Sequence, residues 1–205
     1  MKHHSIYIII SSVVILSTCL FGCLTPVKPN YSLKYYLNPK IEEQKGTDTG
    51  LILAIRGFEC SRAISNYVIY IDNGKLYYTE SEEWAEHPAN VIQRLVAKSL
   101  KNTGRFSDVA SSVEIKNPDM ILVGEITQFY CDEENGLEKI IISLTIRIRE
   151  TKTSRIIFAK EFQIEHEFNE ETQQVNDATN DALSQLSKSL QNEINKIDFN
   201  PLVNK

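Results

Sequence analysis

The sequence has few of the residues that dominate metal centres, disulfide scaffolds and phosphate-binding surfaces. Its 205 residues include 4 Cys, 4 His, 1 Trp, 8 Gly and 6 Pro, and this low glycine and proline content argues against a fibre or extended disorder. The formal net charge is -5 and Lys and Arg form no cluster, which argues against nucleic-acid binding, because phosphate recognition needs a basic surface. Only one uncharged stretch approaches the roughly 20 residues that a bilayer crossing needs, which excludes a multi-span membrane protein.

That uncharged stretch, Ser5 to Val27, predicts a targeting signal and an anchor. Its apolar part, residues 6–20, would reach only about 22 Å as a helix, which is the length of a secretory signal rather than of a membrane span. It ends in Leu20-Phe21-Gly22-Cys23, which resembles the lipobox of bacterial lipoproteins. We therefore expect cleavage before Cys23 and acylation of that cysteine, with chains such as palmitate.

Two alternatives to this processing remain open. Cys19 is a rival lipidation site, although Thr18 before it is bulkier than Gly22, and an uncleaved anchor would need the apolar run to be stretched to about 19 residues. Each outcome leaves the chain tethered outside the cytoplasm. Leu24 is not the Asp that commonly retains such lipoproteins at the inner membrane, so we expect the outer membrane, facing the periplasm.

The expected division of the chain is a signal peptide at 1–22, a lipidated tether at 23–30, one domain at 31–198 and a tail at 199–205. Removal of residues 1–22 leaves 21 Lys and Arg against 27 Asp and Glu, so the processed chain carries a net charge of -6.

The chemistry-bearing side chains of the processed chain do not form a known catalytic or metal-binding motif. His87 and His166 lie outside HExxH and Cys/His clusters, and Glu165-His166-Glu167 is interpreted as the solvated end of a strand. Cys60 and Cys131 could form a disulfide in an oxidising compartment, but two unpaired cysteines are favoured. We therefore predict no enzyme activity, no catalytic or metal site and no cofactor.

Hydrophobic periodicity predicts an α+β domain with a mixed or antiparallel sheet of about six to seven strands and two main helices on one face. Asn73-Gly74 predicts a tight hairpin, and strict alternation from residue 139 to 149 predicts a half-buried strand. Its polar face is interpreted as solvated, although it could meet an acidic partner. The expected strands lie at 31–37, 51–59, 67–71, 76–79, near 109, 120–130, 139–149 and 156–164, and the helices at 88–100 and 175–197.

The stretch from Tyr67 to Val109 resembles a known family. Its features are Tyr67-Val-Ile-Tyr-Ile-Asp72, Glu83-Trp84-Ala85-Glu86-His87-Pro88 before the first helix, and Thr103-Gly104-Arg105-Phe106 after it. These features, with Asp119 to Tyr130 and the turn at 151–155, are similar to the ABC-type transport auxiliary lipoprotein components, the group of paraquat-inducible protein C-like lipoproteins. The family usually has a glycine in the Thr153-Ser154 turn, and Cys60 and Cys131 are not part of its pattern.

The resemblance implies a non-enzymatic component of an MCE-type lipid-transport ABC system, with an MCE-domain protein and the permease and ATPase complex as partners. A docking collar around a ring-shaped partner would suit a homo-oligomer. Tyr77, Tyr78 and Trp84 are candidate partner-interface residues, although Trp84 is expected instead to fasten the helix start onto the sheet. The alternative function is a periplasmic activator or assembly lipoprotein for peptidoglycan synthesis or outer-membrane biogenesis.

Overall fold

A computed structural model describes residues 32–44, 46–134, 137–169, 172–199 and 202. The expected signal peptide, Cys23 and the tether lie outside these ranges. No helix within them is both long and apolar enough to span a membrane. The strands are Leu33–Tyr35 (β1), Ile52–Ile55 (β2), Glu59–Cys60 (β3), Tyr67–Asp72 (β4), Lys75–Trp84 (β5), Asp108–Ser111 (β6), Met120–Glu134 (β7), Leu137–Glu150 (β8) and Ile156–Phe168 (β9), and the helices are Pro88–Lys101 (α2) and Val175–Asn195 (α3).

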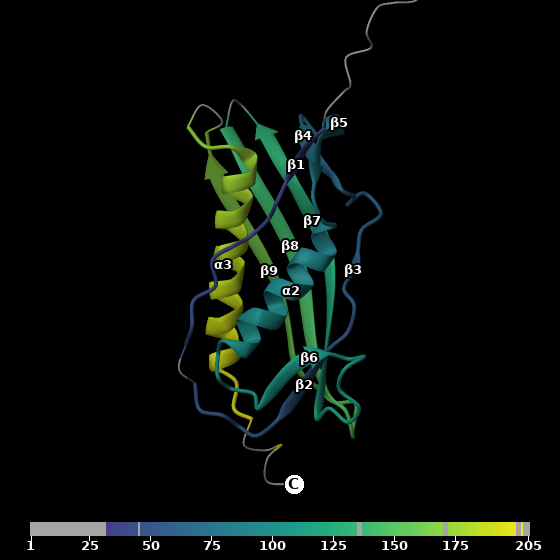
Figure 1. Cartoon of the computed structure of the whole chain (residues 1–205), viewed down its shortest axis with the longest axis vertical. Helices are drawn as coiled ribbons and strands as arrows, with labels where there is room; N and C mark the ends of the chain where they lie inside the picture. The colour runs from purple at the N-terminus through teal and green to yellow at the C-terminus, as the bar shows by residue number, and fades with distance from the viewer. Residues whose placement is uncertain (1–31, 45, 135–136, 170–171, 200–201, 203–205) are drawn as a thin grey trace, which may run out of the picture. The chain divides into compact units, whose positions relative to one another are not determined.

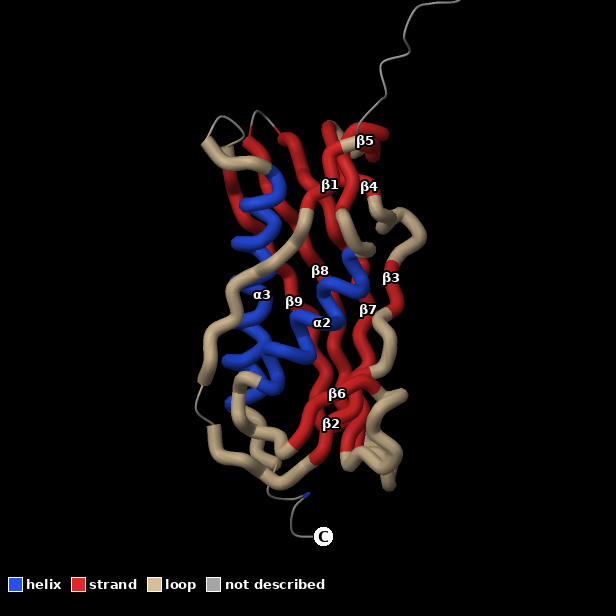
Figure 2. Tube along the Cα trace, viewed as in Figure 1, coloured by secondary structure: helices blue, strands red, loops and turns tan. Residues whose placement is uncertain are grey.

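Strand β7 organises a sheet of 9 strands, and both helices lie on one face of that sheet (Figures 1 and 2). One side of β7 pairs antiparallel with β8, which pairs antiparallel with β9. The other side is shared by three parallel strands in succession: β2 with Leu53 opposite Met120, β3 with Glu59 opposite Glu125, and β4 with Tyr70 opposite Cys131. Strand β6 extends the sheet beyond β2, while β5 and β1 extend it beyond β4.

The core lies between the sheet and the two helices. Alternation along β8 turns Ile140, Ile142, Leu144, Ile146 and Ile148 toward the helices, as the sequence pattern predicts. Helix α3 buries a stripe at helical spacing against β8 and β9 that includes Ala178, Ala182, Leu186, Leu190 and Ile194. The fold class and the placement of two helices on one face are therefore confirmed.

Helix α2 begins and ends where its sequence favours a boundary. Pro88 occupies the first turn, where a missing N–H costs nothing, and Nδ1 of His87 accepts a hydrogen bond from the Ala89 N–H at 3.2 Å. The helix ends at Lys101, and Gly104 takes a φ of 64° shortly after it. Where α2 crosses α3, the hydroxyl oxygens of Ser99 and Ser187 lie 2.6 Å apart in a buried hydrogen bond.

The β4–β5 hairpin has the turn that Asn73-Gly74 predicts. Both residues have positive φ values, 46° for Asn73 and 74° for Gly74, as a type I′ turn requires. Strand β5 is longer than expected, because it continues through a bulge to Trp84 and there pairs with β1.

Two details of extent differ from the expectation. The sheet has nine strands rather than about six to seven, because the expected strand at 51–59 divides into β2 and β3 and the short strands β1 and β6 also pair into the sheet. Phe199, assigned to a tail, is only 1% exposed. It packs edge-on against Phe106 and beneath the Arg105 guanidinium, whose Nη atoms donate to the carbonyls of Asn195 and Ile197 at 3.1 and 2.8 Å. The folded domain therefore includes residue 199.

Candidate functional site

Two tyrosine pairs flank the β4–β5 hairpin, one on each face. Tyr77 stacks on Tyr70 with ring centroids 5.5 Å apart, and Tyr78 stacks on Tyr67 at 5.2 Å. Neighbouring residues of a strand point to opposite faces, so Tyr77 lies on the helix-bearing face and Tyr78 on the helix-free face. The two candidate interface tyrosines therefore do not form one continuous surface.

Tyr77 is tied to the sheet, whereas Tyr78 is the more available of the two. The Tyr77 hydroxyl donates to the Glu133 carboxylate, and this hydrogen bond raises the pKa of Tyr77 well above its usual range. Tyr77 is 39% exposed and Tyr78 is 55% exposed, next to the exposed side chain of Leu76. Leu76 and Tyr78 form an aliphatic and aromatic patch on the helix-free face, which we call the hairpin patch.

Trp84 is a core residue, in agreement with the favoured expectation that it fastens the helix start onto the sheet rather than meeting a partner. Only 4% of its side chain is exposed, and its ring lies 6.0 Å from that of Tyr35 and 5.6 Å, edge-on, from that of Phe129. The backbone N–H of Trp84 donates to the Asn66 carbonyl, and the backbone N–H of Ala85 donates to the Tyr35 carbonyl. Trp84 thus fastens the chain just before α2 onto the sheet.

Glu82 joins three strands at this end of the domain. One carboxylate oxygen accepts from the Tyr35 hydroxyl at 3.0 Å and the other from the Tyr70 hydroxyl at 2.8 Å. The carboxylate thus links β1, β4 and β5 through charge-assisted hydrogen bonds, which are stronger than neutral ones. The sequence gives no signal for this group, because 47 residues separate Tyr35 from Glu82.

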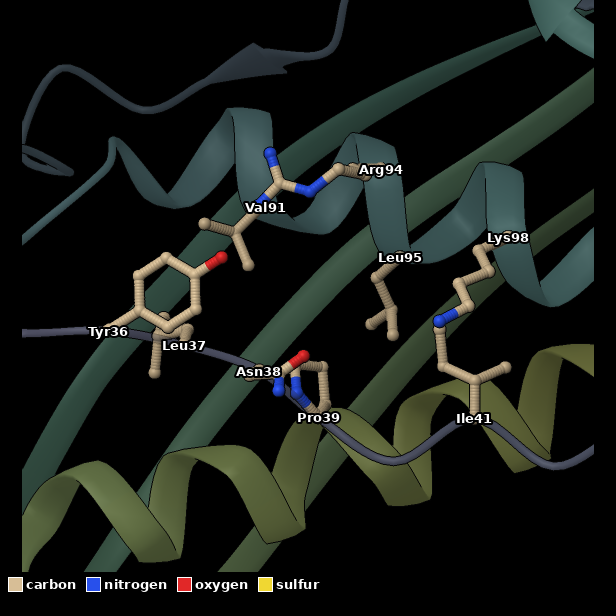
Figure 3. Close-up of a pocket in the computed structure, with 9 residues that line it drawn as sticks. All are labelled: Tyr36, Leu37, Asn38, Pro39, Ile41, Val91, Arg94, Leu95 and Lys98. Atoms are coloured by element: carbon tan, nitrogen blue, oxygen red, sulfur yellow. The ribbon is translucent and has the colours of Figure 1, made fainter.

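Residues 36–41 form a strap that passes between α2 and α3 (Figure 3). The Asn38 N–H donates to Asn180 Oδ1 at 2.7 Å and the Lys40 N–H to Ser184 Oγ at 3.0 Å, so both bonds fix the strap to α3. A hollow of about 140 Å³ lies between the strap and α2, lined by apolar side chains such as Leu37 and Leu95 and by Arg94 and Lys98. Typical small-molecule sites hold about 300–1,000 Å³, so this hollow suits a few waters rather than a lipid.

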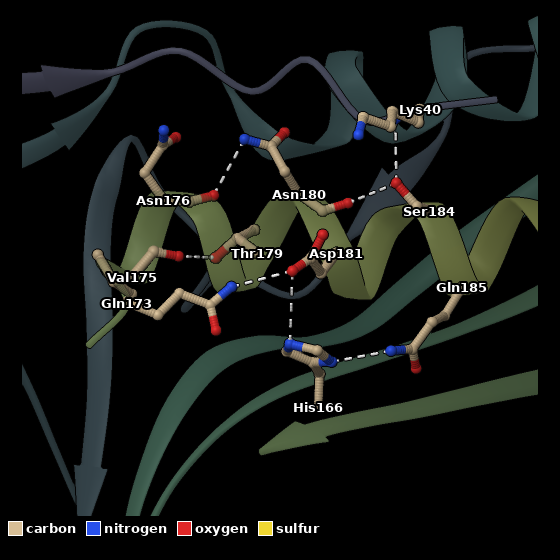
Figure 4. A network of polar contacts seen from close by, with 10 residues as sticks. All are labelled: Lys40, His166, Gln173, Val175, Asn176, Thr179, Asn180, Asp181, Ser184 and Gln185. Carbon is tan, nitrogen blue, oxygen red and sulfur yellow. Dashed lines mark hydrogen bonds and ion pairs between the residues drawn. The ribbon is translucent and has the colours of Figure 1, made fainter. Parts of the chain in front are cut away.

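His166 belongs to a polar cluster between β9 and α3 (Figure 4). Its Nδ1 lies 2.8 Å from Gln185 Nε2, and its Nε2 lies 3.9 Å from Asp181 Oδ2, which also accepts from Gln173 Nε2 at 2.9 Å. The side chain is half-buried beneath α3, so the interpretation of a solvated strand end was wrong for His166. Within the described residues, no group of three or more His, Cys, Asp or Glu could hold a metal ion.

Cys60 lies in β3 and Cys131 in β7, and the two are not joined to each other. Cys60 lies opposite Ile126 of β7, five residues before Cys131 on the same strand. At about 3.3 Å per residue, their separation along β7 is roughly 16 Å, and a disulfide needs Cα atoms within about 7 Å. The disulfide considered from the sequence is therefore not formed, and the lipidation site Cys23 lies outside the described residues.

Comparison with known proteins identifies a family and a shared fold. A model of the ABC-type transport auxiliary lipoprotein components matches residues 35–194. A crystal structure from Xanthomonas campestris, of the DUF330 family, has a TM-score of 0.66 at 17% identity, covering 77% of this chain and 92% of that chain. An uncharacterized protein has a TM-score of 0.55 at 14% identity, covering 80% and 97%. Both likenesses show the fold alone.

A weaker likeness is to the PelC dodecamer of Paraburkholderia phytofirmans, with a TM-score of 0.44 at 11% identity, covering 73% of this chain and 93% of that chain. It carries no argument about this chain, whose oligomeric state stays a prediction. No curated protein matches the chain.

Proposed function

Because this chain belongs to the ABC-type transport auxiliary lipoprotein component family, we propose that it is the non-enzymatic, lipid-anchored accessory subunit of an MCE-type lipid-transport ABC system. The observation that carries the proposal is the extent of the match, which runs from β1 to the last turn of α3. In this proposal Cys23 carries the lipid, the domain faces the periplasm from the outer membrane, and its partners are an MCE-domain protein and the permease and ATPase complex.

The proposed action is docking rather than chemistry. The hairpin patch supports it, since tyrosine is one of the side chains that most often anchor protein interfaces, and Leu76 extends the exposed apolar surface beside Tyr78. The patch also lies at the end of the sheet where β1 brings the described chain into the domain, beside β5.

The test is affinity purification of the full-length lipoprotein from detergent-solubilised envelopes after mild crosslinking. We expect recovery of an MCE-domain protein together with the permease and ATPase. The double variant Leu76→Ser and Tyr78→Ser should reduce that recovery, while Lys116→Ser, an exposed control elsewhere on the surface, should not. Recovery of peptidoglycan synthases or outer-membrane assembly proteins alone would favour the alternative function and overturn the proposal.

The anchor and its membrane are tested separately. Mass spectrometry of the native protein should find an acylated Cys23 as the first residue, and density-gradient fractionation should place the protein with outer-membrane markers. An intact Met1 would contradict cleavage, and co-migration with inner-membrane markers would contradict the proposed location. We also propose that the protein forms a homo-oligomeric collar around its ring-shaped partner. Sedimentation of the detergent-solubilised protein should then show a mass of several copies, and a monomer mass would contradict the collar.

A further inference from the structure

We propose that the outer edge of β9 is a docking site for an extended segment of a partner protein, which adds to the sheet as a tenth strand and carries Lys or Arg side chains on the helix-free face. The inference rests on the proposed docking role and adds to it a second surface, a binding mode and the chemistry of the partner segment.

The length of this edge distinguishes it from the other edges of the sheet. Strands that end a sheet are usually kept short, bulged or covered, since their unpaired N–H and C=O groups attract other strands. The edge strands β1 and β6 follow this rule with 3 and 4 residues, and β5 pairs with β1 only at residues 82–84, which leaves the shorter stretch 75–81 open, whereas β9 has 13 residues. From Ile156 to Phe168 the described ladder bonds of β9 run to β8, and no described strand pairs with its outer side.

A groove follows this edge on the helix-bearing face. It lies between β9 and α3, holds about 320 Å³ and is lined by Lys160, Phe162 and Ile164 from β9 and by Ser189, Asn192 and Glu193 from α3. In strand addition the main chain supplies the hydrogen bonds, and a pocket beside the edge receives alternate side chains of the added strand. The groove is in position to receive one such side chain.

The charged group in the groove does not block the edge. An inward-pointing lysine can protect an edge strand from pairing, and Lys160 points to the helix-bearing face. Here its ammonium is engaged by Glu193 at 2.9 Å and lies 5.8 Å from the centre of the Phe162 ring. Glu193 also accepts from Lys196 at 2.6 Å, so the charges are drawn toward α3 and away from the free backbone of β9.

The helix-free face of β9 determines the chemistry of the partner. Glu161, Glu165 and Glu167 all project to this face, where alternate residues share one side. Glu167 pairs with Lys139 at 3.3 Å, whereas Glu161 and Glu165 are exposed and form no ion pair within the described residues. An added strand with Lys or Arg opposite these two carboxylates gains cross-strand ion pairs.

The same carboxylates disfavour a second copy of this chain as the added strand. Antiparallel pairing of β9 with itself over its whole length centres on Phe162 and places Glu161 opposite Gln163 of the other copy. Glu161 then has Glu161 and Glu165 of that copy as its diagonal neighbours, and like charges so placed repel. A basic partner strand meets no such repulsion.

The test uses the full-length protein in detergent and a nine-residue peptide in which lysine and valine alternate. We expect the peptide to slow hydrogen exchange at alternate amides of residues 157–167, because those amides gain acceptors. A matched peptide that is N-methylated at the amides facing β9 keeps its charge but cannot pair, so it should give no protection. Equal protection by both peptides, or protection elsewhere, would mean that charge alone attracts the peptide and would overturn the proposal.

Charge reversal provides a second readout. The exposed double variant Glu161→Lys and Glu165→Lys should weaken binding by more than about 2-fold and up to about 30-fold, the effect of two cross-strand pairs. The matched control Glu43→Lys and Glu80→Lys, with the same change in net charge away from β9, should bind within about 2-fold of the original protein. The protein could instead sediment as a dimer and show protected β9 amides before any peptide is added. That result would assign the edge to self-association and overturn the proposal.

Purification with the Glu161→Lys and Glu165→Lys variant separates this inference from the proposed function. Recovery of the MCE-domain protein at an undiminished level would support the function but contradict a role of β9 in it. If neither the original protein nor the variant recovers the MCE-domain protein, while the peptide still adds to β9 of the original protein, the proposed function is contradicted and strand addition is still supported.

Discussion

The two sides of β7 are built in different ways. On one side, β7, β8 and β9 form a meander of long antiparallel strands joined by short connections. On the other side, short strands from distant parts of the chain share the edge of β7 in turn. The first side is stabilised by its ladder and its apolar face, while the second also needs side-chain links such as Glu82 and close backbone contacts such as that at Gly46. We therefore expect the largest loss of stability from a mutation in the core of the first side, and smaller or more local effects from mutations on the second side.

The largest effect is expected from Leu144→Ala in the middle of the meander. Leu144 is fully buried, so its truncation removes apolar contacts and leaves a cavity, which should lower the free energy of unfolding by about 2–5 kcal/mol. Urea denaturation measures this, with Thr145→Ala on the opposite face of β8 as the control, expected to cost less than about 1 kcal/mol. Similar losses for both variants would contradict the division of β8 into a buried and an open face.

The next effect is expected from Gly46→Ala on the other side. A methyl group at Gly46 would lie 2.3 Å from the Thr103 carbonyl oxygen, so the segment before β2 must shift away from the end of α2. We expect a loss of about 1–3 kcal/mol in the free energy of unfolding. Gly57→Ala is the matched control, since nothing lies within 4 Å of its added methyl group. A loss as large for Gly57→Ala would assign the effect to chain flexibility rather than to the contact.

A smaller and more local effect is expected from Glu82→Ala. The change leaves the Tyr35 and Tyr70 hydroxyls without this acceptor and should cost about 1–2 kcal/mol. Hydrogen exchange should accelerate at residues 33–35 much more than in β8. Glu80→Ala, at an exposed position of the same strand, should leave both rates unchanged, and equal acceleration in β1 and β8 would show that the link is not local.

The smallest effect is expected from acid acting on Glu193. Hydrogen bonds from Lys196 and then Lys160 hold the pKa of Glu193 below its usual value. Since the pKa is lower in the folded state, the stabilisation is complete above the unfolded value of about 4.3 and is lost as the pH falls through the lowered value. The Tm difference between the original protein and Glu193→Gln should shrink between pH 6 and pH 3. A constant difference would show that the ion pairs add nothing.

The sequence predicted the meander well and the other side poorly, for a physical reason. In β8, the apolar residues at alternate positions from Ile140 to Ile148 all face the helices, so strand and core follow from the pattern, although Ile141 and Ser143 on the opposite face are also buried. Strand β3 has two residues, and its pairing is decided by β7 rather than by its own composition. The hairpin turn was predictable because Asn73 and Gly74 tolerate positive φ.

The candidate site divides in the same way. That Tyr77 and Tyr78 face opposite sides follows from strand geometry alone. The burial of Trp84 depends on Tyr35 and Phe129, which are distant in sequence. The groove beside β9 depends on where α3 lies over the sheet, and no local pattern in either segment specifies that position.

The shared edge of β7 also fixes an order of events during folding. Leu53 and Tyr70 pair with residues that lie more than 60 positions later in the chain, at Met120 and Cys131. Since a chain is made from its N-terminus, β2 and the side of β4 that faces β7 must wait for their partner until β7 has emerged, and their apolar side chains stay uncovered meanwhile. The meander closes through local turns as soon as it is made. The last strands to be synthesised therefore provide the template on which the earliest ones assemble, and a chain that ends before β7 leaves those strands exposed to aggregation.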